Sequence, residues 1–247
     1  MKFSELVNEK YLKPIERYDK QLKNWHNIKI KENSEKLVSL RDVSNKIILS
    51  PQYYINNIPG AINDCLVRES LVSKLINIAN KLPKGYSILV WDAYRNIETQ
   101  QALFDHYYGI FKKETKLSGN ELLEYTKKFV SLPSLDPLKP SPHNTGAAID
   151  LTICDKDFKT INFGVEFDEF KEEANTFFYE DRIDSLNKEE YEILLNRRIL
   201  CNLFTEEGFV NYPYEIWHKS YMDQMYCELK DINIATYGSC SNKLNMK

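Results

Sequence analysis

Hydrophobic and polar residues follow a helical pattern in two parts of the chain. In the first part, apolar residues recur at intervals of four, three and four positions: Leu71, Leu75, Ile78 and Leu82. Pro83 and Gly85 follow, so this stripe predicts a helix of roughly 16 residues that ends before them. The second stripe begins behind a capping box of Asn187 and Glu190, and Gly208 marks its end. Two amphipathic helices are therefore expected.

A strand-type pattern follows the first helix. YSILVWDAYRN (residues 86–96) contains a short apolar run, which predicts a strand that carries Asp92 and Arg95 to a turn. Asn96 can then cap a further helix. A weaker helix is expected between residues 115 and 142, ahead of a proline-rich stretch.

Two more strands are expected towards the C-terminus. AIDLTIC (residues 148–154) alternates apolar and polar positions, which predicts a half-buried strand with Asp150 on its non-core face. Residues 209–221, FVNYPYEIWHKSY, predict another strand. Helices and strands are mixed without regular alternation, and this order favours an α+β fold.

The N-terminal part of the chain differs from the rest. Residues 1–35 are rich in Lys, Glu and Asn, and they have helical character in FSELVNEKY and IERYDKQLKNW. We expect them to form an N-terminal helical extension, with residues 36–247 as the main domain. Residues 38–62 are irregular and aromatic and contain Pro51 and Pro59, so they are candidates for the walls of a cleft.

Length and composition indicate a folded protein whose partners are neither nucleic acids nor membranes. Of the 247 residues, 43% are hydrophobic, and the net charge of -3 includes no long run of one sign. No apolar stretch is long enough to span a bilayer, and the N-terminus lacks the apolar region of a signal peptide, so we expect a cytoplasmic protein. The scattered spacing of the cysteines is typical of reduced thiols: Cys65, Cys154, Cys201, Cys227 and Cys240.

The candidate chemistry begins in SPHNTGAAID (residues 141–150), which holds one of only four histidines. His143 and Asp150 are either an incidental loop and strand start or half of a metal site. On an uninterrupted strand, residues seven positions apart face opposite sides. A shared metal therefore requires a turn or bulge between them, which Asn144 and Gly146 permit.

A second candidate group lies in YEIWH (residues 214–218) and contributes Glu215 and His218. Hydrolytic zinc sites use three histidine or carboxylate ligands, and a further carboxylate acts as base. His143, Asp150 and His218 supply such ligands, although each residue taken singly is more typical of a structural position. This ligand set suits zinc best among common ions, while iron uses the same set and stays open.

The two motifs resemble the paired signatures of the M15 zinc peptidases. SPHNTGAAID fits S-x-H-x-x-G-x-A-x-D, and EIWH fits E-x-W-H. This family includes D-alanyl-D-alanine carboxypeptidases, phage endolysins and VanX-type D-alanyl-D-alanine dipeptidases, and the chain is most similar to the dipeptidases. VWDAYRN, INFGVEFDEF and NRRILCNLFTEEGF resemble further segments of that branch, so the likeness covers roughly residues 38 to 230.

The resemblance implies a fold and a set of roles. The fold would be a small antiparallel sheet flanked by helices, of the hedgehog and D,D-peptidase type, with the zinc site at the sheet face. The zinc ligands would be His143, Asp150 and His218. Glu215 would be the general base, Arg95 would stabilise the oxyanion, and Ser141 would help to hold the substrate carboxylate.

One substrate-binding position departs from the dipeptidase pattern. In that branch an aspartate of a D-M-G-T segment binds the free amino group of the dipeptide, and the matching residue here is Asn162. An amide carries no charge to pair with an ammonium. Binding of the amino group would therefore be weaker unless Glu166 or Asp168 supplies the missing charge.

These features lead to the hypothesis of a cytoplasmic zinc dipeptidase that hydrolyses D-alanyl-D-alanine or a related short D-amino-acid dipeptide. One alternative is a D,D-carboxypeptidase or endopeptidase that acts on peptidoglycan stem peptides, although such enzymes usually work outside the membrane. Another is a protein of the same fold that binds a peptide without cutting it. The altered Asn162 favours this binding protein, and the retained Glu215 disfavours it.

Overall fold

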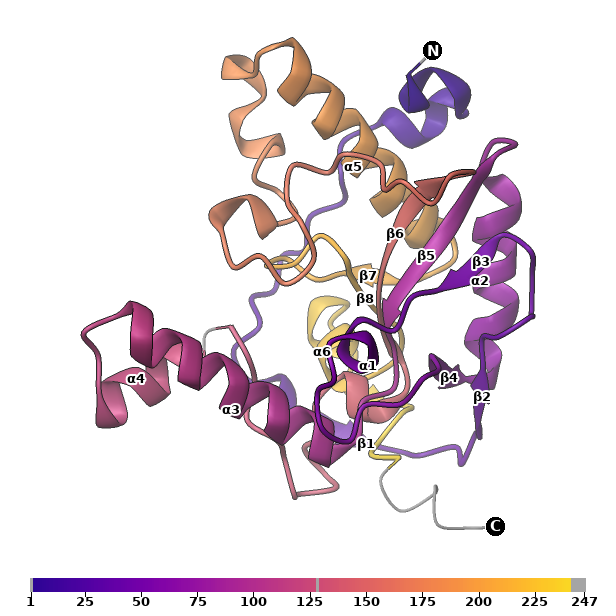
Figure 1. Ribbon diagram of the computed structural model, residues 1–247. Coiled ribbons are helices and arrows are strands. Elements are labelled where there is room, and N and C mark those ends of the chain that lie inside the picture. The colour runs from indigo at the N-terminus through magenta and orange to yellow at the C-terminus, as the bar shows by residue number, and fades with distance from the viewer. Residues whose placement is uncertain (1, 128, 241–247) are drawn as a thin grey trace.

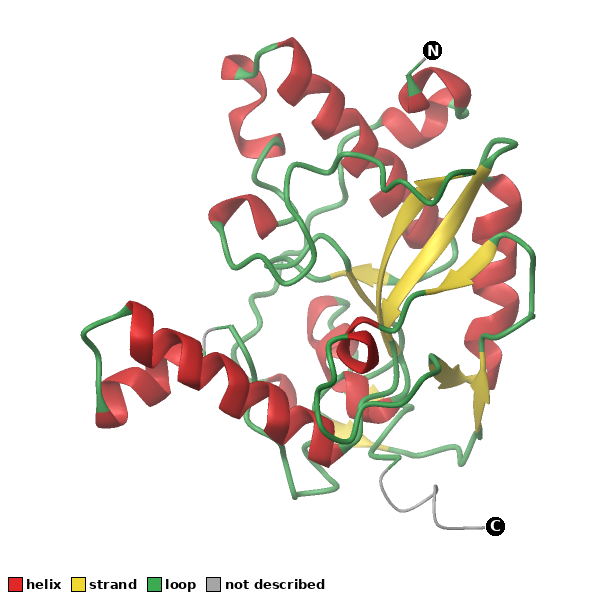
Figure 2. Ribbon diagram, in the orientation of Figure 1, coloured by secondary structure: helices red, strands yellow, loops and turns green. Residues whose placement is uncertain are grey.

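The computed structural model describes residues 2–127 and 129–240 and has a mixed α and β architecture (Figures 1 and 2). Its centre is a five-stranded sheet in the order β3-β5-β6-β8-β7. Neighbouring strands are antiparallel except at one edge, where β3 and β5 run parallel. The strands are β3 (Ile47–Leu49), β5 (Tyr86–Asp92), β6 (Ala148–Asp155), β8 (His218–Ser220) and β7 (Val210–Asn211). The expected α+β class is confirmed, with a parallel pair at the β3 edge.

Two smaller ladders join distant parts of the chain. β1 and β9 are parallel and connect the N-terminal segment to the C-terminal one, while β2 and β4 are antiparallel. Their bounds are β1 (Lys29–Ile30), β9 (Ile234–Ala235), β2 (Leu37–Ser39) and β4 (Leu66–Arg68).

Helices surround the sheet. Buried residues of α2 and α5 share one hydrophobic core with the sheet strands, whereas α3 and α4 form a hairpin that projects away from the sheet (Figure 1). The α-helices are α1 (Gln52–Ile55), α2 (Glu69–Lys81), α3 (Ile97–Glu114), α4 (Gly119–Thr126), α5 (Lys188–Glu206) and α6 (Gln224–Leu229). The 3-10 helices are η1 (Phe3–Leu6), η2 (Glu9–Leu12), η3 (Trp25–Asn27), η4 (His143–Thr145), η5 (Glu172–Ala174) and η6 (Glu180–Ser185).

Local sequence signals account for the helix ends. The stripe of α2 buries Leu71, Leu75 and Ile78, as predicted. Asn96 caps α3 by accepting a hydrogen bond from the Thr99 backbone N–H at 2.8 Å. Asn187 and Glu190 form the predicted reciprocal capping box of α5.

Two strand predictions are wrong in detail. β6 is buried on both faces rather than half-buried, because it is the middle strand of the sheet and both of its faces are covered. Residues 209–221 form no single strand. They fold as the hairpin of β7 and β8, closed by the Tyr212 N–H donating to the His218 carbonyl at 3.1 Å. Glu215 consequently lies on the hairpin loop.

The predicted helical character of residues 1–35 is found only as 3-10 turns. IERYDKQLKNW forms no α-helix, although its apolar residues have helical spacing. Its groups bond instead to distant parts of the protein. The Ile15 N–H donates to Glu180 at 2.9 Å, and the Tyr18 hydroxyl accepts from the Asn211 N–H at 2.8 Å. Tertiary contacts thus override the local pattern.

The lengths of the helices and the state of the cysteines can be compared with what the sequence predicts. Within residues 2–127 and 129–240, no helix is both long and apolar enough to cross a membrane. The five cysteines all lie within the described residues, are buried and form no disulfide bond, as expected for reduced thiols.

Candidate metal centre

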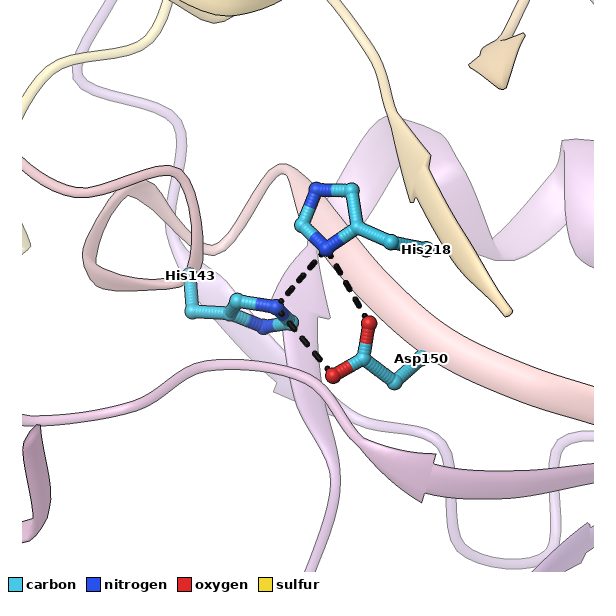
Figure 3. Close-up of side chains that lie close together, drawn as sticks. All are labelled: His143, Asp150 and His218. Carbon is cyan, nitrogen blue, oxygen red and sulfur yellow. Dashed lines mark hydrogen bonds and ion pairs between the residues drawn. The ribbon is translucent and has the colours of Figure 1, made fainter. Parts of the chain in front are cut away.

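Three potential metal ligands meet at the centre of the sheet. His143 comes from η4, Asp150 from β6 and His218 from the start of β8, and their side chains point toward one another (Figure 3). His143 Nε2 lies 3.1 Å from His218 Nδ1 and 3.3 Å from Asp150 Oδ2. His218 Nδ1 lies 3.0 Å from Asp150 Oδ1. All three residues are buried.

The chain brings these residues together in two ways. Asp150 and His218 are direct cross-strand partners in the β6–β8 ladder. His143 reaches the same point because η4 and Gly146 break the chain before β6. Gly146 has φ of 70°, and a Cβ there would lie 2.3 Å from a methyl group of Leu37. The break anticipated between His143 and Asp150 is therefore present, and only glycine fits it.

The donor set fits a zinc ion. Two ligand atoms about 2.1 Å from a tetrahedral metal are roughly 3.4 Å apart, close to the three separations found here. The other ring nitrogens are also held, with His143 Nδ1 2.7 Å from the Ala93 carbonyl and His218 Nε2 3.1 Å from Ser220 Oγ. Such partners orient the rings of metal-binding histidines.

The electrostatics of the cluster suit a bound cation. Burial lowers the pKa of His218 to about 4, so its imidazole stays neutral and able to act as a ligand. Burial raises the pKa of Asp150, but the two histidines outweigh burial, and the pKa lies well below its usual range. The Asp150 carboxylate is consequently ionised, as a carboxylate that binds a metal ion has to be.

Glu215 lies beside the cluster, on the β7–β8 loop. Its Oε2 is 4.0 Å from His218 Nδ1, and its side chain is 25% exposed. Burial raises the pKa of Glu215 well above its usual value, and the negative charges of Asp150 and Asp168 raise it further. The carboxylate is thus close to the candidate ligands and also lines the cavity described below.

Arg95 is a buried arginine held in a fixed orientation. Its Nη2 and Nε donate to Asp92 Oδ2 at 2.8 and 3.0 Å, and Nη1 donates to Gln100 at 3.0 Å. Nη2 also lies 3.3 Å from the Tyr53 hydroxyl and 3.7 Å from Asp150 Oδ2. The guanidinium therefore lies beside the cluster as a preorganised positive charge.

These groups open into one cavity of about 730 Å³. Its walls include the cluster residues together with Arg95, Ser141, Glu215 and Tyr53. Tyr53 belongs to the aromatic segment that was expected to form a cleft wall, and this expectation is confirmed.

Asn162 does not join the other predicted site residues. It is exposed, it is not among the described residues that line the cavity, and its Oδ1 accepts a hydrogen bond from the Gly164 N–H at 2.8 Å. Asp168 lines the cavity instead. Its Oδ2 accepts hydrogen bonds from the hydroxyls of Tyr53 at 2.9 Å and Tyr107 at 3.1 Å. From the sequence, Asp168 is predicted only as one of two residues that could supply the negative charge that Asn162 lacks.

The environment of Asp168 is unusual in two respects. Burial raises its pKa to about 6, and the charge of Asp150 adds to this shift. Its backbone has φ of 56°, in the left-handed region that non-glycine residues seldom adopt. Strained residues of this kind cluster at functional sites.

Two buried histidines and an aspartate, flanked by a glutamate and an arginine in one cavity, define the class of site found in metal-dependent hydrolases. The sequence model of a peptidase family, M15, described as D-ala-D-ala dipeptidase, matches residues 33–234. The chain belongs to this family.

A curated D-alanyl-D-alanine dipeptidase from Synechocystis sp. is similar to part of this chain. It is 33% identical over 153 residues, which are 58% of this chain and 62% of that protein. The match thus spans less than two thirds of the relative.

Two solved structures resemble the fold distantly. A mutant of the vancomycin resistance D,D-pentapeptidase VanY from a VanB-type cassette, in complex with Zn(II), has a TM-score of 0.43 and 17% identity, with 85% of this chain and 96% of that chain covered. The D,D-dipeptidase VanXYg, in complex with a D-Ala-D-Ala phosphinate analogue, has a TM-score of 0.37 and 21% identity, with coverage of 84% and 68%. Family membership rests on the sequence match alone.

Proposed function

We propose that this protein is a zinc-dependent dipeptidase that hydrolyses D-alanyl-D-alanine, or a related short D-amino-acid dipeptide, to free amino acids. The observation that carries the proposal is the convergence of His143, Asp150 and His218 beside Glu215 in one cavity. Membership of the dipeptidase family supplies the substrate class.

His143, Asp150 and His218 would hold the metal ion. Their donor types and spacings fit zinc, as described above. When bound, zinc supplies a Lewis acid that polarises a carbonyl group and makes water reactive near neutral pH.

Glu215 would move the protons of the reaction. Its carboxylate is close enough to the ligands to accept a proton from the attacking water and to donate it to the leaving amine. Both transfers involve the same carboxylate oxygens.

Arg95 would stabilise the negative charge that develops on the carbonyl oxygen. Asp92 and Gln100 hold its guanidinium in place before the substrate arrives. Such preorganised charge typically contributes about 10²–10³-fold to turnover.

Ser141 and Asp168 would bind the two ends of the dipeptide. Ser141 lines the cavity beside His143 and would hold the carboxylate. Asp168, rather than the exposed Asn162, would pair with the ammonium group, because its carboxylate faces the same cavity.

One observation favours a second function, cleavage of longer peptidoglycan stem peptides. The cavity of about 730 Å³ is lined not only by the cluster but also by Lys127, Lys171 and Arg182. This volume is within the range of pockets that hold ligands larger than a dipeptide.

The cytoplasmic location and the lack of nucleic-acid or membrane partners stay predictions from the sequence.

The proposal is tested by measuring free D-alanine released from D-Ala-D-Ala by the zinc-loaded protein. N-acetyl-D-Ala-D-Ala serves as the comparison, and the Glu215→Ala variant serves as the blank. We expect release from the free dipeptide. Preferred cleavage of the acetylated peptide would favour the carboxypeptidase alternative, and bound zinc without cleavage of either peptide would favour a binding protein.

A further inference from the structure

A second cavity lies behind the wall of the first. It has a volume of about 610 Å³. Four side chains line both cavities and therefore stand between them: Tyr53, Leu103, Tyr107 and Asp168. The second cavity is also lined by polar and aromatic groups: Gln52, Asn56, Trp91, His106, Glu166 and Phe167.

The wall between the cavities is assembled from separate parts of the chain. Tyr53 comes from α1, Tyr107 from α3, and Asp168 from the loop after β6. Both tyrosine hydroxyls donate to the same oxygen of Asp168, Oδ2, at 2.9 and 3.1 Å. These bonds hold the wall closed across three elements.

Ring packing supports the same arrangement. The Tyr107 ring meets Phe170 edge to face with centroids 4.8 Å apart, and the Tyr53 ring lies 5.8 Å from Phe167. Phe167 and Phe170 flank Asp168 on its loop. The tyrosines therefore contact both the carboxylate and the loop that carries it.

The wall lies at the amino end of the substrate if the function proposed above holds. Asp168 is then the counter-charge of the ammonium group, so the group points at the wall. The Tyr53 and Tyr107 hydroxyls both donate to Asp168 Oδ2. Within the described residues, no hydrogen bond is made to Asp168 Oδ1. Oδ1 is thus left for the ammonium.

We propose that Tyr53 and Tyr107 determine substrate length, because the wall they form with Asp168 leaves room for only one residue on the amino side of the scissile bond. This inference rests on the proposed function. An additional residue at the amino end must displace the tyrosines, or turn back into the first cavity and lose its contact with Asp168. The second cavity is the space that such a residue enters once the wall is open.

The test compares kcat/KM for D-Ala-D-Ala with that for D-Ala-D-Ala-D-Ala, which keeps a free ammonium and so isolates length from charge. We expect the wild-type protein to prefer the dipeptide. In Tyr107→Ala, the ratio of tripeptide to dipeptide should rise roughly tenfold or more. Tyr108→Ala is the matched control, because Tyr108 stacks on Phe104 in the same helix but lines neither cavity within the described residues.

Milder variants separate the wall from folding. Tyr107→Phe and Tyr53→Phe keep the rings and remove the hydroxyls, so they should raise the ratio in the same direction but by less. Equal use of both peptides by the wild type, or an unchanged ratio in Tyr107→Ala, would overturn the proposal. Should Tyr107→Ala not fold, an unchanged ratio in the two phenylalanine variants would overturn it.

A binding arm distinguishes this inference from the proposed function. Both peptides are titrated into zinc-loaded Glu215→Gln protein, with and without Tyr107→Ala, and their affinities are measured by calorimetry. If the wild type turns over neither peptide but binds the dipeptide more tightly, and Tyr107→Ala removes this preference in binding, the dipeptidase function is rejected and the role of the wall is supported. Failure of both peptides to bind, or a preference that Tyr107→Ala leaves intact, would reject the wall.

Discussion

At the scale of single residues, each carboxylate of the site contacts a different set of groups. Asp92 pairs with Arg95, Asp150 contacts both histidines, and Asp168 accepts from two tyrosines. Glu215 forms no ion pair with a lysine or arginine in the described part of the chain, and its partner at 4.0 Å is His218. Glu215 is thus the carboxylate best placed to exchange protons with a substrate.

Replacement of this carboxylate should remove turnover and spare the metal. In Glu215→Gln, kcat for D-Ala-D-Ala should fall by about 10²–10⁴-fold, the usual contribution of a general base. Zinc content, measured by elemental analysis, should match that of the wild type because no ligand is changed. Glu172→Gln, at an exposed position of the cavity rim, is the control. A kcat within twofold of the wild type in Glu215→Gln would exclude the assigned role.

At the scale of elements, one loop carries Asp168 and is held by α5. Arg197 on α5 is fully buried and donates to the carbonyls of Phe163 at 2.7 Å, Asn175 at 2.8 Å and Glu173. Ala174 in the same loop accepts from the Ile216 N–H at 2.9 Å. The loop of Asp168 is thereby tied to the loop of Glu215.

The hydrogen bonds of Arg197 to the Asp168 loop explain why some site residues could be predicted from the sequence and others could not. His143, Asp150 and His218 belong to two short motifs, and a β-ladder with one glycine break brings the motifs together. The position of Asp168 depends on carbonyl groups bonded to Arg197, which carry no sequence signature. Asn162 and Asp168 are six positions apart on that loop, and only the loop path decides which of them faces the cavity.

Removal of the Arg197 guanidinium should destabilise the protein strongly. Burial lowers the pKa of Arg197 to about 10, yet three carbonyls depend on its donors. Arg197→Met should reduce the free energy of unfolding by about 2–5 kcal/mol in urea denaturation. Arg41→Met, at a surface position 51% exposed, should change it by less than about 0.5 kcal/mol. A loss in Arg197→Met as small as in Arg41→Met would contradict this support of the loop.

At the scale of the whole molecule, the N-terminal segment lies against α5. Tyr11 donates to Glu206 at 2.6 Å, and Lys10 and Lys81 form ion pairs with the same glutamate at 2.7 and 3.0 Å. Farther along, Glu32 pairs with the buried Arg68, which also donates to the carbonyl of Thr145, a residue of η4 together with His143. The division of the chain at residue 35 stays a prediction, and the segment before it contacts both α5 and the support of the site.

The contacts of Glu206 should make stability depend on pH. Hydrogen bonds from Lys10, Tyr11 and Lys81 lower its pKa from 4.5 to about 2. A carboxylate with a lowered pKa stabilises the fold above its unfolded pKa, and this contribution is lost as the pH falls through the folded value. Glu206→Gln should therefore be less stable than the wild type at pH 7, and the difference should shrink between pH 4.5 and 2.

Urea denaturation at several pH values measures this difference. The effect should be modest because the Glu206 side chain is 37% exposed and its ion pairs are screened by solvent. Glu114→Gln, an exposed glutamate outside the ion pairs of the described residues, is the control. A stability difference that stays constant down to pH 2 would show that Glu206 does not anchor the segment through its charge.

Peptide hydrolysis should depend on one zinc ion held by His143, Asp150 and His218. The most direct measurement titrates metal-free protein with zinc while D-alanine release from D-Ala-D-Ala is recorded. We expect release to rise with bound zinc and to reach a plateau at one ion per chain, and we expect His218→Ala neither to bind zinc at this level nor to gain activity. Release without zinc, or full activity in zinc-treated His218→Ala, would contradict it.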